Sequence, residues 1–464
     1  MAAATRNVRR AAPLVGVLVA AWFAAAPGAA AQEGPPVADL NSALAEAYRT
    51  SPELEAARAR VRAAAERIPQ ALAGFRPSLF LRGSVESVTG DAETTFGTRS
   101  HLDNTATAGA LAVQQNLYAG GGTTAAVRAA EAGFEAERLR LLDSTQNVLL
   151  GAVEAYVAVW RDREVLRLAE ANRERLRRHL QATRDRFQVG EVTRTDVAQA
   201  EARLEQARAE VERAIAQLRA SEASFLRVVG RPAAERLAEP RMVAELPADL
   251  GEALAQVDGH PLVRAALMDL ELARAARREA VAGLLPRVDL EASLSAADDP
   301  TTQLDWQRSA SVRLGVSVPV WQGGLQHARV REAGQQIQAA QRAVDAARRE
   351  VARRVRTAFE QLRATEAAIR AVEAQVRANR VALQGVEQEA AVGARTVLDV
   401  LDAEQELVRS EVDLARARAD RVTAAYGLAA ALGRLLPGEL GPVVEPYDPE
   451  FYARQARRRL FGLE

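Results

Sequence analysis

The stretch VGARTVLDVLDA, from Val392 to Ala403, interrupts a long run rich in alanine, glutamate and arginine. A second copy, VGEVTRTDVAQA, runs from Val189 to Ala200, 203 residues earlier, and repeats the Gly, Thr, Asp and Val at the same spacing. Each copy lies between two long segments of helical periodicity, so Gly190 and Gly393 are expected to end one helix before the next begins. The sequence therefore predicts a duplicated chain with a helical hairpin in each half, its tip at one of these turns.

The composition restricts the class of protein. The 464 residues include no cysteine, which excludes disulfides, thiol nucleophiles and cysteine metal sites. The 61 basic and 61 acidic side chains balance, so no bulk charge favours a nucleic-acid partner. The internal repeat favours one intertwined unit over the several domains that the length alone suggests.

The amino terminus has the pattern of a secretory signal peptide. Three arginines precede an apolar run from Ala11 to Ala26, and Ala29-Ala30-Ala31 forms a small-residue cleavage site. The alternative is a transmembrane anchor, but Pro13 and Pro27 bracket a run shorter than the ~20 residues that a spanning helix needs. We expect residues 1–31 to be removed and the mature chain to be exported.

The repeat divides the rest of the chain into two halves, a linker and a tail. The predicted boundaries are 32–231 for the first repeat, 232–247 for the linker, 248–436 for the second repeat and 437–464 for a C-terminal periplasmic tail. The first helical segment of each repeat ends near a proline, Pro77 or Pro286, and the period of apolar residues then changes to two. Each half is thus predicted to contain a helix, two strands, a long helix, a tip and a return helix.

Four segments alternate apolar and polar side chains as strands do. The predicted strands are 78–88, 108–118, 287–296 and 311–321, and polar loops, 89–107 and 297–308, join each pair. Strands of about ten residues with one apolar face and aromatic residues near their ends are typical of a transmembrane β-barrel. The alternation alone also fits an antiparallel sheet with one wet face. Because four strands are too few to close a barrel, a sheet that spans the membrane requires several copies of the chain.

The whole pattern resembles a known family. The signal peptide, the two repeats and the tip sequences VGARTVLDVLDAEQEL and VGEVTRTDV are similar to those of the TolC family of outer-membrane efflux and type I secretion channels. The stretch from Tyr447 to Gly462, YDPEFYARQARRRLFG, also resembles the tail of these channels. The resemblance covers essentially the whole mature chain.

The resemblance implies a mainly α-helical fold with a small β part. In a homotrimer, each chain would give four strands to a 12-stranded β-barrel surrounded by outer-membrane lipid, and the helices would continue it as an α-helical barrel across the periplasm. The implied function is a passive duct, opened at its tip by a periplasmic adaptor protein and an inner-membrane ABC or RND-type pump. It implies no enzymatic activity, no cofactor and no nucleic-acid partner.

The matching positions also imply roles for the tip residues. Asp399 and Asp402 would form aspartate rings at the closed periplasmic entrance, the gate of the channel. Arg395 would be the cation that links neighbouring coiled coils, with Thr195 and Asp196 of the first tip as its acceptors. The family often has a tyrosine shortly before the second-tip glycine where this chain has Ala390, which predicts a gate that is held more weakly or by other contacts.

The spacing of the two aspartates supports one hypothesis and leaves one alternative. Asp399 and Asp402 lie three residues apart at a predicted helix start, so they share a face, and threefold symmetry would gather six carboxylates around one axis. Crowded carboxylates raise their pKa values or recruit a cation. The hypothesis is a cation-selective entrance, blocked by multivalent metal ions that bind these two residues. The alternative is a pair of ordinary carboxylates favoured at a helix N-terminus.

Other function classes have weaker support. The four histidines, which are His101, His179, His260 and His327, have no metal-ligand spacing, and the mature chain has no glycine-rich phosphate loop or nucleophile elbow. The main competing interpretation is a periplasmic coiled-coil adaptor without a pore. An adaptor with one hairpin does not need two copies of a hairpin plus amphipathic strands, so the duplication favours the channel.

Overall fold

The computed structural model describes residues 35–93, 95–97, 99–241, 246–301, 304–436, 446–459 and 462. The predicted signal peptide, residues 1–31, lies outside them. The helices and strands of the described part are, in chain order, α1 (Leu40–Thr50), α2 (Pro52–Leu72), the 3-10 helix η1 (Ala73–Phe75), β1 (Ser78–Glu93), β2 (Arg99–Ala119), α3 (Gly122–Gln188), α4 (Arg194–Val229), α5 (Leu250–Ala255), η2 (Val257–Gly259), α6 (Pro261–Ala282), β3 (Arg287–Thr301), β4 (Leu304–Ser317), α7 (Leu325–Ala391), α8 (Val397–Ala431) and α9 (Pro449–Arg458).

Two long helices separate the sheet from the hairpin tips. The helices α3 and α7 contain 67 residues each, which makes each about 100 Å long at 1.5 Å per residue. Both begin directly after a glycine with φ of 82°, Gly121 or Gly324. Only glycine adopts this left-handed conformation without strain, and here it turns the chain from a strand into a helix. No helix among the described residues has both the length and the apolarity to cross a membrane.

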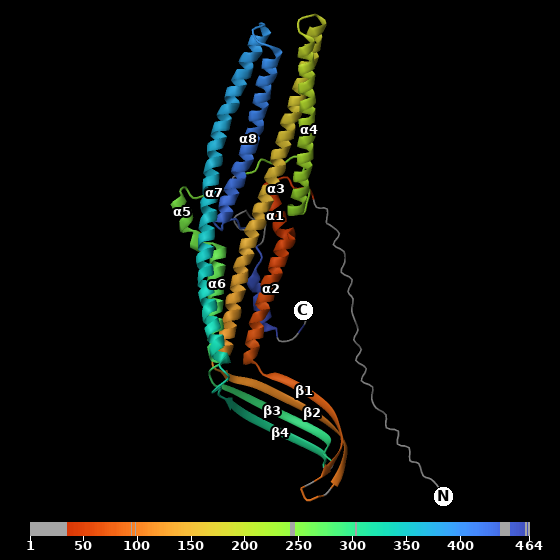
Figure 1. Ribbon diagram of the computed structural model, residues 1–464, viewed down its shortest axis with the longest axis vertical. Coiled ribbons are helices and arrows are strands. Elements are labelled where there is room, and N and C mark those ends of the chain that lie inside the picture. The colour runs from red at the N-terminus through yellow and green to blue at the C-terminus, as the bar shows by residue number, and fades with distance from the viewer. Residues whose placement is uncertain are drawn as a thin grey trace, which may run out of the picture. The chain divides into compact units, whose positions relative to one another are not determined.

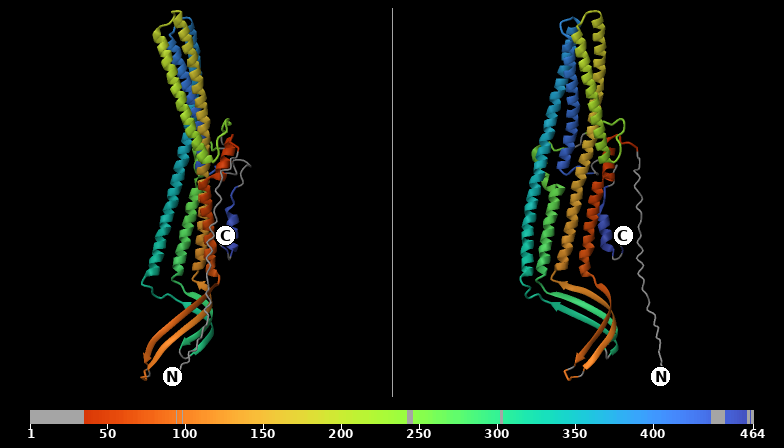
Figure 2. Two further views of the ribbon diagram at one scale, coloured as in Figure 1. Left: turned by 90° about the vertical axis from the view of Figure 1, so that its right-hand side faces the viewer. Right: turned by 45° about the vertical axis from the view of Figure 1, so that its right-hand side comes forward.

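The long helices are stabilised by packing along their whole length. In the first half α2 and α4 both contact α3, and in the second half α6 and α8 both contact α7 (Figures 1 and 2). The two halves join because α3 also packs against α6 and α8. Helices of this length owe their stability to such tertiary contacts rather than to propensity alone. The repeated order of elements confirms the predicted duplication and the mainly α-helical fold with a small sheet.

The four strands form one antiparallel sheet in the order β1-β2-β3-β4, with β1 and β4 at its edges. The register places side chains of like character on one face: Leu81 pairs with Leu111, Leu111 with Leu294, and Leu294 with Ala310. The opposite face carries hydroxyl pairs, such as Ser293 with Ser311 at 2.8 Å. Alternation along each strand thus gives the sheet one apolar face and one polar face.

The predicted strand limits were wrong at several ends. The polar segments 89–107 and 297–308, predicted as loops, are mostly strand, because the ladder continues to the pair Glu93 and Arg99 and, on the other hairpin, to Thr301 and Leu304. Backbone pairing does not require apolar side chains, and polar cross-strand pairs support it. The fourth strand ends at Ser317 rather than at residue 321. Pro319 follows and has no N–H to donate to a ladder.

A buried apolar core lies where α1 and α2 pack against α3, α4 and α8. Tyr156 of α3 is fully buried, and its hydroxyl donates 2.7 Å to the carbonyl of Ala238 and 3.1 Å to that of Ala38. Its ring packs against Phe225 of α4, with the centroids 6.3 Å apart. This single side chain therefore holds together the segment before α1, the linker between the repeats and the first hairpin.

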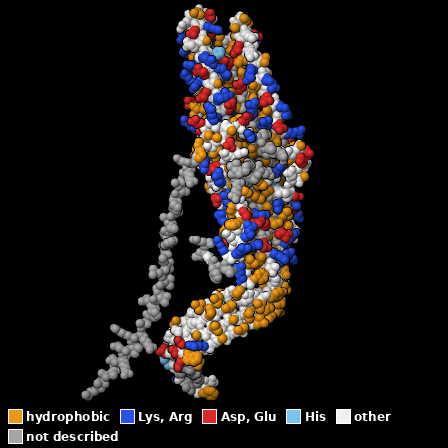
Figure 3. All heavy atoms as spheres, turned by 180° about the vertical axis from the view of Figure 1, so that it is seen from behind, with side chains coloured by type: hydrophobic (Ala, Val, Ile, Leu, Met, Phe, Trp, Pro, Cys, Tyr) orange, Lys and Arg blue, Asp and Glu red, His pale blue; other side chains and the backbone are white. Residues whose placement is uncertain are grey.

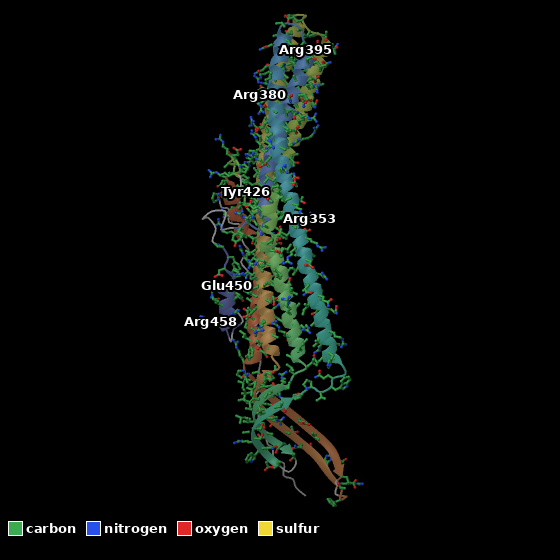
Figure 4. The ribbon with its side chains drawn as sticks, turned by 90° about the vertical axis from the view of Figure 1, so that its left-hand side faces the viewer. Arg353, Arg380, Arg395, Tyr426, Glu450 and Arg458 are labelled. Atoms are coloured by element: carbon green, nitrogen blue, oxygen red, sulfur yellow. The ribbon has the colours of Figure 1, made fainter. Side chains whose placement is uncertain are left out.

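The C-terminal tail contains the helix α9. Residues 437–445 of the tail lie outside the described residues. The helix packs against α2, and the hydroxyl of Tyr452 lies 2.8 Å from a carboxylate oxygen of Glu66. The N–H of Tyr447 donates to the hydroxyl of Tyr48, 3.0 Å away. Figure 4 shows α9 beside the helices, with Arg458 nearer the sheet than Glu450. The tail therefore closes over the first repeat.

Candidate functional site

The two hairpin tips have the same turn. Gly190 and Gly393 have φ of 82° and 79°, and each N–H donates to the carbonyl three residues back. The next N–H, of Glu191 or Ala394, donates to the carbonyl five residues back. These paired bonds are the glycine-based C-cap that satisfies the last carbonyls of a helix. The repeated sequence thus gives two geometrically matched tips.

Each return helix begins with a capping box. At the second tip the carboxylate of Asp399 accepts from the N–H of Thr396 at 2.9 Å and from its hydroxyl at 2.8 Å, and the Asp399 N–H donates back to that hydroxyl. Thr193 and Asp196 make the same bonds at the first tip. These bonds, chiefly the one from the backbone N–H of Thr396, hold the pKa of Asp399 below its ordinary value. Asp399 is therefore an ionised carboxylate fixed at the helix start.

Asp402 lies one turn further along α8 and has a different partner. A carboxylate oxygen of Asp402 lies 2.6 Å from a guanidinium nitrogen of Arg203 on α4. This ion pair joins the return helices of the two hairpins, which contact each other little elsewhere. The two predicted gate residues therefore differ, because Asp399 caps its own helix and Asp402 links the hairpins.

Arg395 bonds within its own hairpin. Its Nε lies 2.8 Å from a carboxylate oxygen of Glu389, and this bond raises the pKa of the guanidinium further. Figure 4 shows Arg395 at the tip, beyond Arg380 on the same hairpin. Among the described residues, Arg395 forms no bond with Thr195 or Asp196 of its own chain, so the link to these two residues stays a prediction about a neighbouring copy.

A second link between the hairpins lies deeper. His179 of α3 and Glu404 of α8 are 3.0 Å apart, from Nε2 to Oε1, and Glu404 is only 5% exposed. The other oxygen of Glu404 is buried and has no hydrogen-bond partner among the described residues. A small apolar cluster from α3, α4 and α8 packs beside both links; its buried members are Leu176, Leu180, Ala200, Leu204, Ala207 and Leu401. The tips are thus held by apolar contacts and two charged bonds.

The sequence prediction missed Arg203, His179 and Glu404. One signal was available, because His179 precedes its turn glycine by eleven residues and Glu404 follows the other turn glycine by eleven. Equal distances from two matched tips place side chains at one level of the helical layer. Periodicity alone does not indicate which helix faces meet, so the histidine seemed isolated.

The link between His179 and Glu404 predicts a pH-dependent stability. The hydrogen bond that the His179 ring donates to the carboxylate of Glu404, opposed by burial, raises the pKa of His179 above its ordinary 6.5; Glu387 adds to the rise and Arg178 opposes it. A raised folded-state pKa gives stability that is complete below pH 6.5 and is lost as pH rises through the folded-state value. We expect His179→Gln, which keeps a hydrogen-bond donor but does not titrate, to cost about 1 kcal/mol at pH 6 and progressively less at higher pH.

The measurement is the melting temperature of the purified protein from pH 5.5 to 9.5, as the difference between the native chain and His179→Gln. His327→Gln, on an exposed part of α7, is the matched control and is expected to leave that difference flat. A difference for His179→Gln that does not change with pH contradicts a titrating link.

Comparison with known proteins identifies the family. The family model described as outer membrane efflux protein matches residues 43–231 and 252–434, which together make up most of the chain and span both repeats. The chain belongs to the outer membrane efflux protein family. Among its relatives, the outer membrane efflux protein BepC of Brucella suis biovar 1 is 33% identical over 428 residues, which is 91% of each protein. The outer membrane protein TolC of Escherichia coli is 26% identical over 417 residues, 86% of this chain and 82% of TolC.

Solved structures of outer-membrane channels have the same fold. The CmeC outer membrane channel of Campylobacter jejuni superposes with a TM-score of 0.76 at 15% identity, over 90% of this chain and 89% of that one. The outer membrane protein VceC of Vibrio cholerae gives a TM-score of 0.74 at 21% identity, over 85% and 96%. At such low identities the likeness concerns the fold alone.

Family membership settles the main functional alternatives. This efflux-family protein is an outer-membrane channel of efflux or secretion, and not an adaptor without a pore. It resides in the outer membrane of a Gram-negative bacterium, with its helical part extending into the periplasm. The family consists of channel and transport proteins, and its TolC-like members work with periplasmic adaptors and inner-membrane pumps.

Proposed function

We propose that three copies of the mature chain form one passive duct, closed at its periplasmic tips until an adaptor protein and an inner-membrane ABC or RND-type pump engage it. The observation that carries the proposal is the pair of free sheet edges. The edge strands β1 and β4 contain 16 and 14 residues. Unpaired backbone groups are not tolerated in lipid, so each edge needs a partner. Pairing β4 of one copy with β1 of the next closes a barrel of 12 strands from three four-stranded sheets.

The exposed side chains of the sheet agree with this assembly. Large apolar residues on the apolar face are widely exposed in a single chain: Leu81 is 83% exposed and Val312 is 77% exposed. Figure 3 shows that the face of the sheet turned to the viewer is hydrophobic and uncharged over most of its length, with charged side chains gathered at the end away from the helices. A contiguous apolar face of this kind marks a membrane or protein interface. The proposal assigns it to outer-membrane lipid.

The proposed gate combines links within each chain and between chains. Within a chain, Arg203 with Asp402 and His179 with Glu404 hold the two hairpins together. Between chains, Arg395 reaches Thr195 and Asp196 of the neighbouring copy. The ionised Asp399 carboxylates, with those of Asp402, surround the threefold axis. Engagement of the adaptor and pump breaks these links and separates the tips. Residues 1–31 are removed as the signal peptide before assembly.

The test is single-channel conductance of the mature protein in a planar bilayer, with a trivalent cation added on the tip side. We expect the native channel to be blocked and Asp399→Asn with Asp402→Asn to escape the block, because the amides match the carboxylates in size and remove six charges per trimer, while the ion pair of Asp402 with Arg203 is lost as well. The control is Glu191→Gln, which removes an exposed tip carboxylate outside the proposed ring and is expected to remain blocked.

Two outcomes contradict the proposal. Unchanged block in the double variant removes both aspartates from the entrance. Absence of any pore from a well-folded, trimeric sample contradicts the duct itself.

A further inference from the structure

The apolar face of the sheet contains a hollow. Gly83, Gly109 and Ala296 lie side by side on β1, β2 and β3, since Gly83 pairs with Gly109 and Gly109 with Ala296. Larger side chains border Gly109 and Ala296 of this row, and together these residues form a groove of about 590 Å³, lined mainly by Leu81, Gly109, Leu111, Leu294, Ala296, Arg308 and Ala310. The register places all of these residues on the apolar face.

The small residues are not required by packing within the chain. A Cβ added at Gly109 has no atom within 4 Å, and one added at Gly83 meets only a backbone oxygen at 4.0 Å. Neither glycine has a positive φ. Gly109 therefore leaves open a space that a larger side chain could fill without strain, and glycine inside a strand is unfavourable unless something else approaches closely there.

An arginine side chain lies at the end of the row formed by Gly83, Gly109 and Ala296. Arg308 on β4 pairs with Ala296, so the row of small residues leads directly to its side chain. Towards the helices, the same face of β4 carries only apolar side chains, from Ala310 to Val316. The guanidinium carbon of Arg308 lies 5.6 Å from the centre of the Trp306 ring.

Among the residues that the structure describes, none forms a hydrogen bond or an ion pair with the guanidinium of Arg308. Asp298 lies diagonally across on β3 as the partner of Trp306, but no ion pair joins it to Arg308, and no carboxylate among the described residues is within ion-pairing distance. The guanidinium thus lies against an aromatic ring, and no residue in the described part of the chain uses its hydrogen-bond donors. A planar guanidinium in this state is suited to bidentate binding of a phosphate.

The position along the strand decides which leaflet is involved. Nine residues separate Arg308 from Ser317 at the helical end of β4. At ~3.3 Å per residue and a tilt of ~40°, this is about 23 Å across the membrane, close to the ~25 Å height of a barrel's apolar band. Since the helices extend into the periplasm, Arg308 and Trp306 lie at the outer-leaflet boundary, and the groove runs from them into the hydrocarbon.

We propose that this face is a binding site for a phosphorylated outer-leaflet lipid of the lipid A type, with an acyl chain in the groove over Gly109 and Ala296 and a phosphate on Arg308. The inference rests on the proposed embedding of the sheet in the membrane. The glycine row supplies shape, and the ring of Trp306 holds the guanidinium in place. Each copy of the chain carries one such site on the lipid-facing surface.

The experiment titrates the purified mature trimer in neutral detergent with bisphosphorylated lipid A, dephosphorylated lipid A and phosphatidylglycerol, and counts bound lipid by native mass spectrometry. We expect tight binding of bisphosphorylated lipid A only. Arg308→Gln is expected to weaken it roughly tenfold or more, since a charge-assisted bond is lost, and Arg308→Lys, which keeps the charge but not the planar fork, is expected to weaken it less than Arg308→Gln does. Gly109→Leu, which fills the groove, is expected to weaken binding while Arg308 remains.

Matched controls separate this site from general charge effects. Arg313→Gln removes a cation from the polar face of the same strand and is expected to leave binding unchanged, and Asp298→Asn is expected to leave it unchanged or strengthen it. Equal affinity for phosphatidylglycerol, or an equal loss in Arg313→Gln, overturns the proposal. If the sheet is not embedded, the native protein also fails to insert into vesicles; insertion without lipid A binding contradicts this site alone.

Discussion

Reversing the charge of Arg203 is expected to leave the periplasmic entrance open at rest. The native pair of Arg203 and Asp402, at 2.6 Å, joins α4 to α8 across the two hairpins. The side chains are 32% and 55% exposed, so the bond itself contributes only about 0.2–1 kcal/mol. Arg203→Glu both removes this attraction and places two carboxylates together. The contact between α4 and α8 is thereby destabilised by roughly 1–2 kcal/mol in each chain.

Threefold assembly multiplies this modest change. Three equivalent links act on one gate, so the closed state loses about 3–6 kcal/mol, and the ratio of closed to open channels falls roughly a hundredfold or more. The measurement is resting conductance in a planar bilayer, together with the sensitivity of cells to a large polar antibiotic. Arg203→Glu is expected to raise both, and Arg203→Ala to raise them less.

The charge-swapped variant is the decisive control. Arg203→Glu combined with Asp402→Arg restores the pair with its charges exchanged and is expected to return conductance towards the native value. A native conductance in Arg203→Glu, from trimers of normal stability, would falsify the role of this link in closure. Open channels in the swapped variant would instead assign the effect to the altered identity of Asp402.

A charge on the apolar face of the sheet is expected to prevent insertion into the membrane. Val312 lies on the apolar face of β4, five residues from Ser317, which is about 13 Å into the membrane at ~3.3 Å per residue and ~40° tilt. An arginine near the midplane of a lipid-facing barrel surface costs about 2–4 kcal/mol. Val312→Arg in three copies is therefore expected to destabilise the inserted trimer by roughly 6–12 kcal/mol, so that insertion into the outer membrane largely fails.

The matched control is Ser311→Arg, one position away on the polar face of the same strand, where Arg313 is already accommodated. It is expected to insert normally, apart from the loss of one hydroxyl pair. The readout is the fraction of heat-resistant trimer in purified outer membranes. Similar insertion of both variants would support the alternative of a sheet with one wet face, since a solvated arginine there has little effect.

The periodicity of apolar residues predicted the helices and strands, but the residues at which the strands end depend on pairing with neighbouring strands. The change of period after Pro77 and Pro286 located the sheet, because apolar spacing records which face is buried. It did not predict that Asp91 with His101 and Glu93 with Arg99 continue a ladder, since cross-strand pairs are not a local signal. The end of β4 was predictable, because Pro319 cannot join a ladder and was present in the sequence.

The turns at the two hairpin tips were predictable from the sequence, whereas the bonds between the two hairpins were less so. Gly190, Gly393 and their following threonines have local signatures, since a C-cap and a capping box involve residues close in sequence. The pair of Arg203 and Asp402 joins residues 199 apart, and no spacing rule connects them. Such bonds become visible only when it is known which faces of α3, α4 and α8 meet.

The contacts of the C-terminal tail with α1 and α2 have a consequence for the order in which the exported chain folds. Tyr447 donates to Tyr48 across 399 residues, and both rings stack on the guanidinium of Arg58. In a chain that leaves the inner membrane amino end first, α1 and α2 enter the periplasm long before α9 follows to cover them. Completion of the first repeat therefore coincides with release of the last residues. A chain that ends before Tyr447 cannot make these contacts, so the apolar surface of the first repeat that α9 covers stays exposed in it.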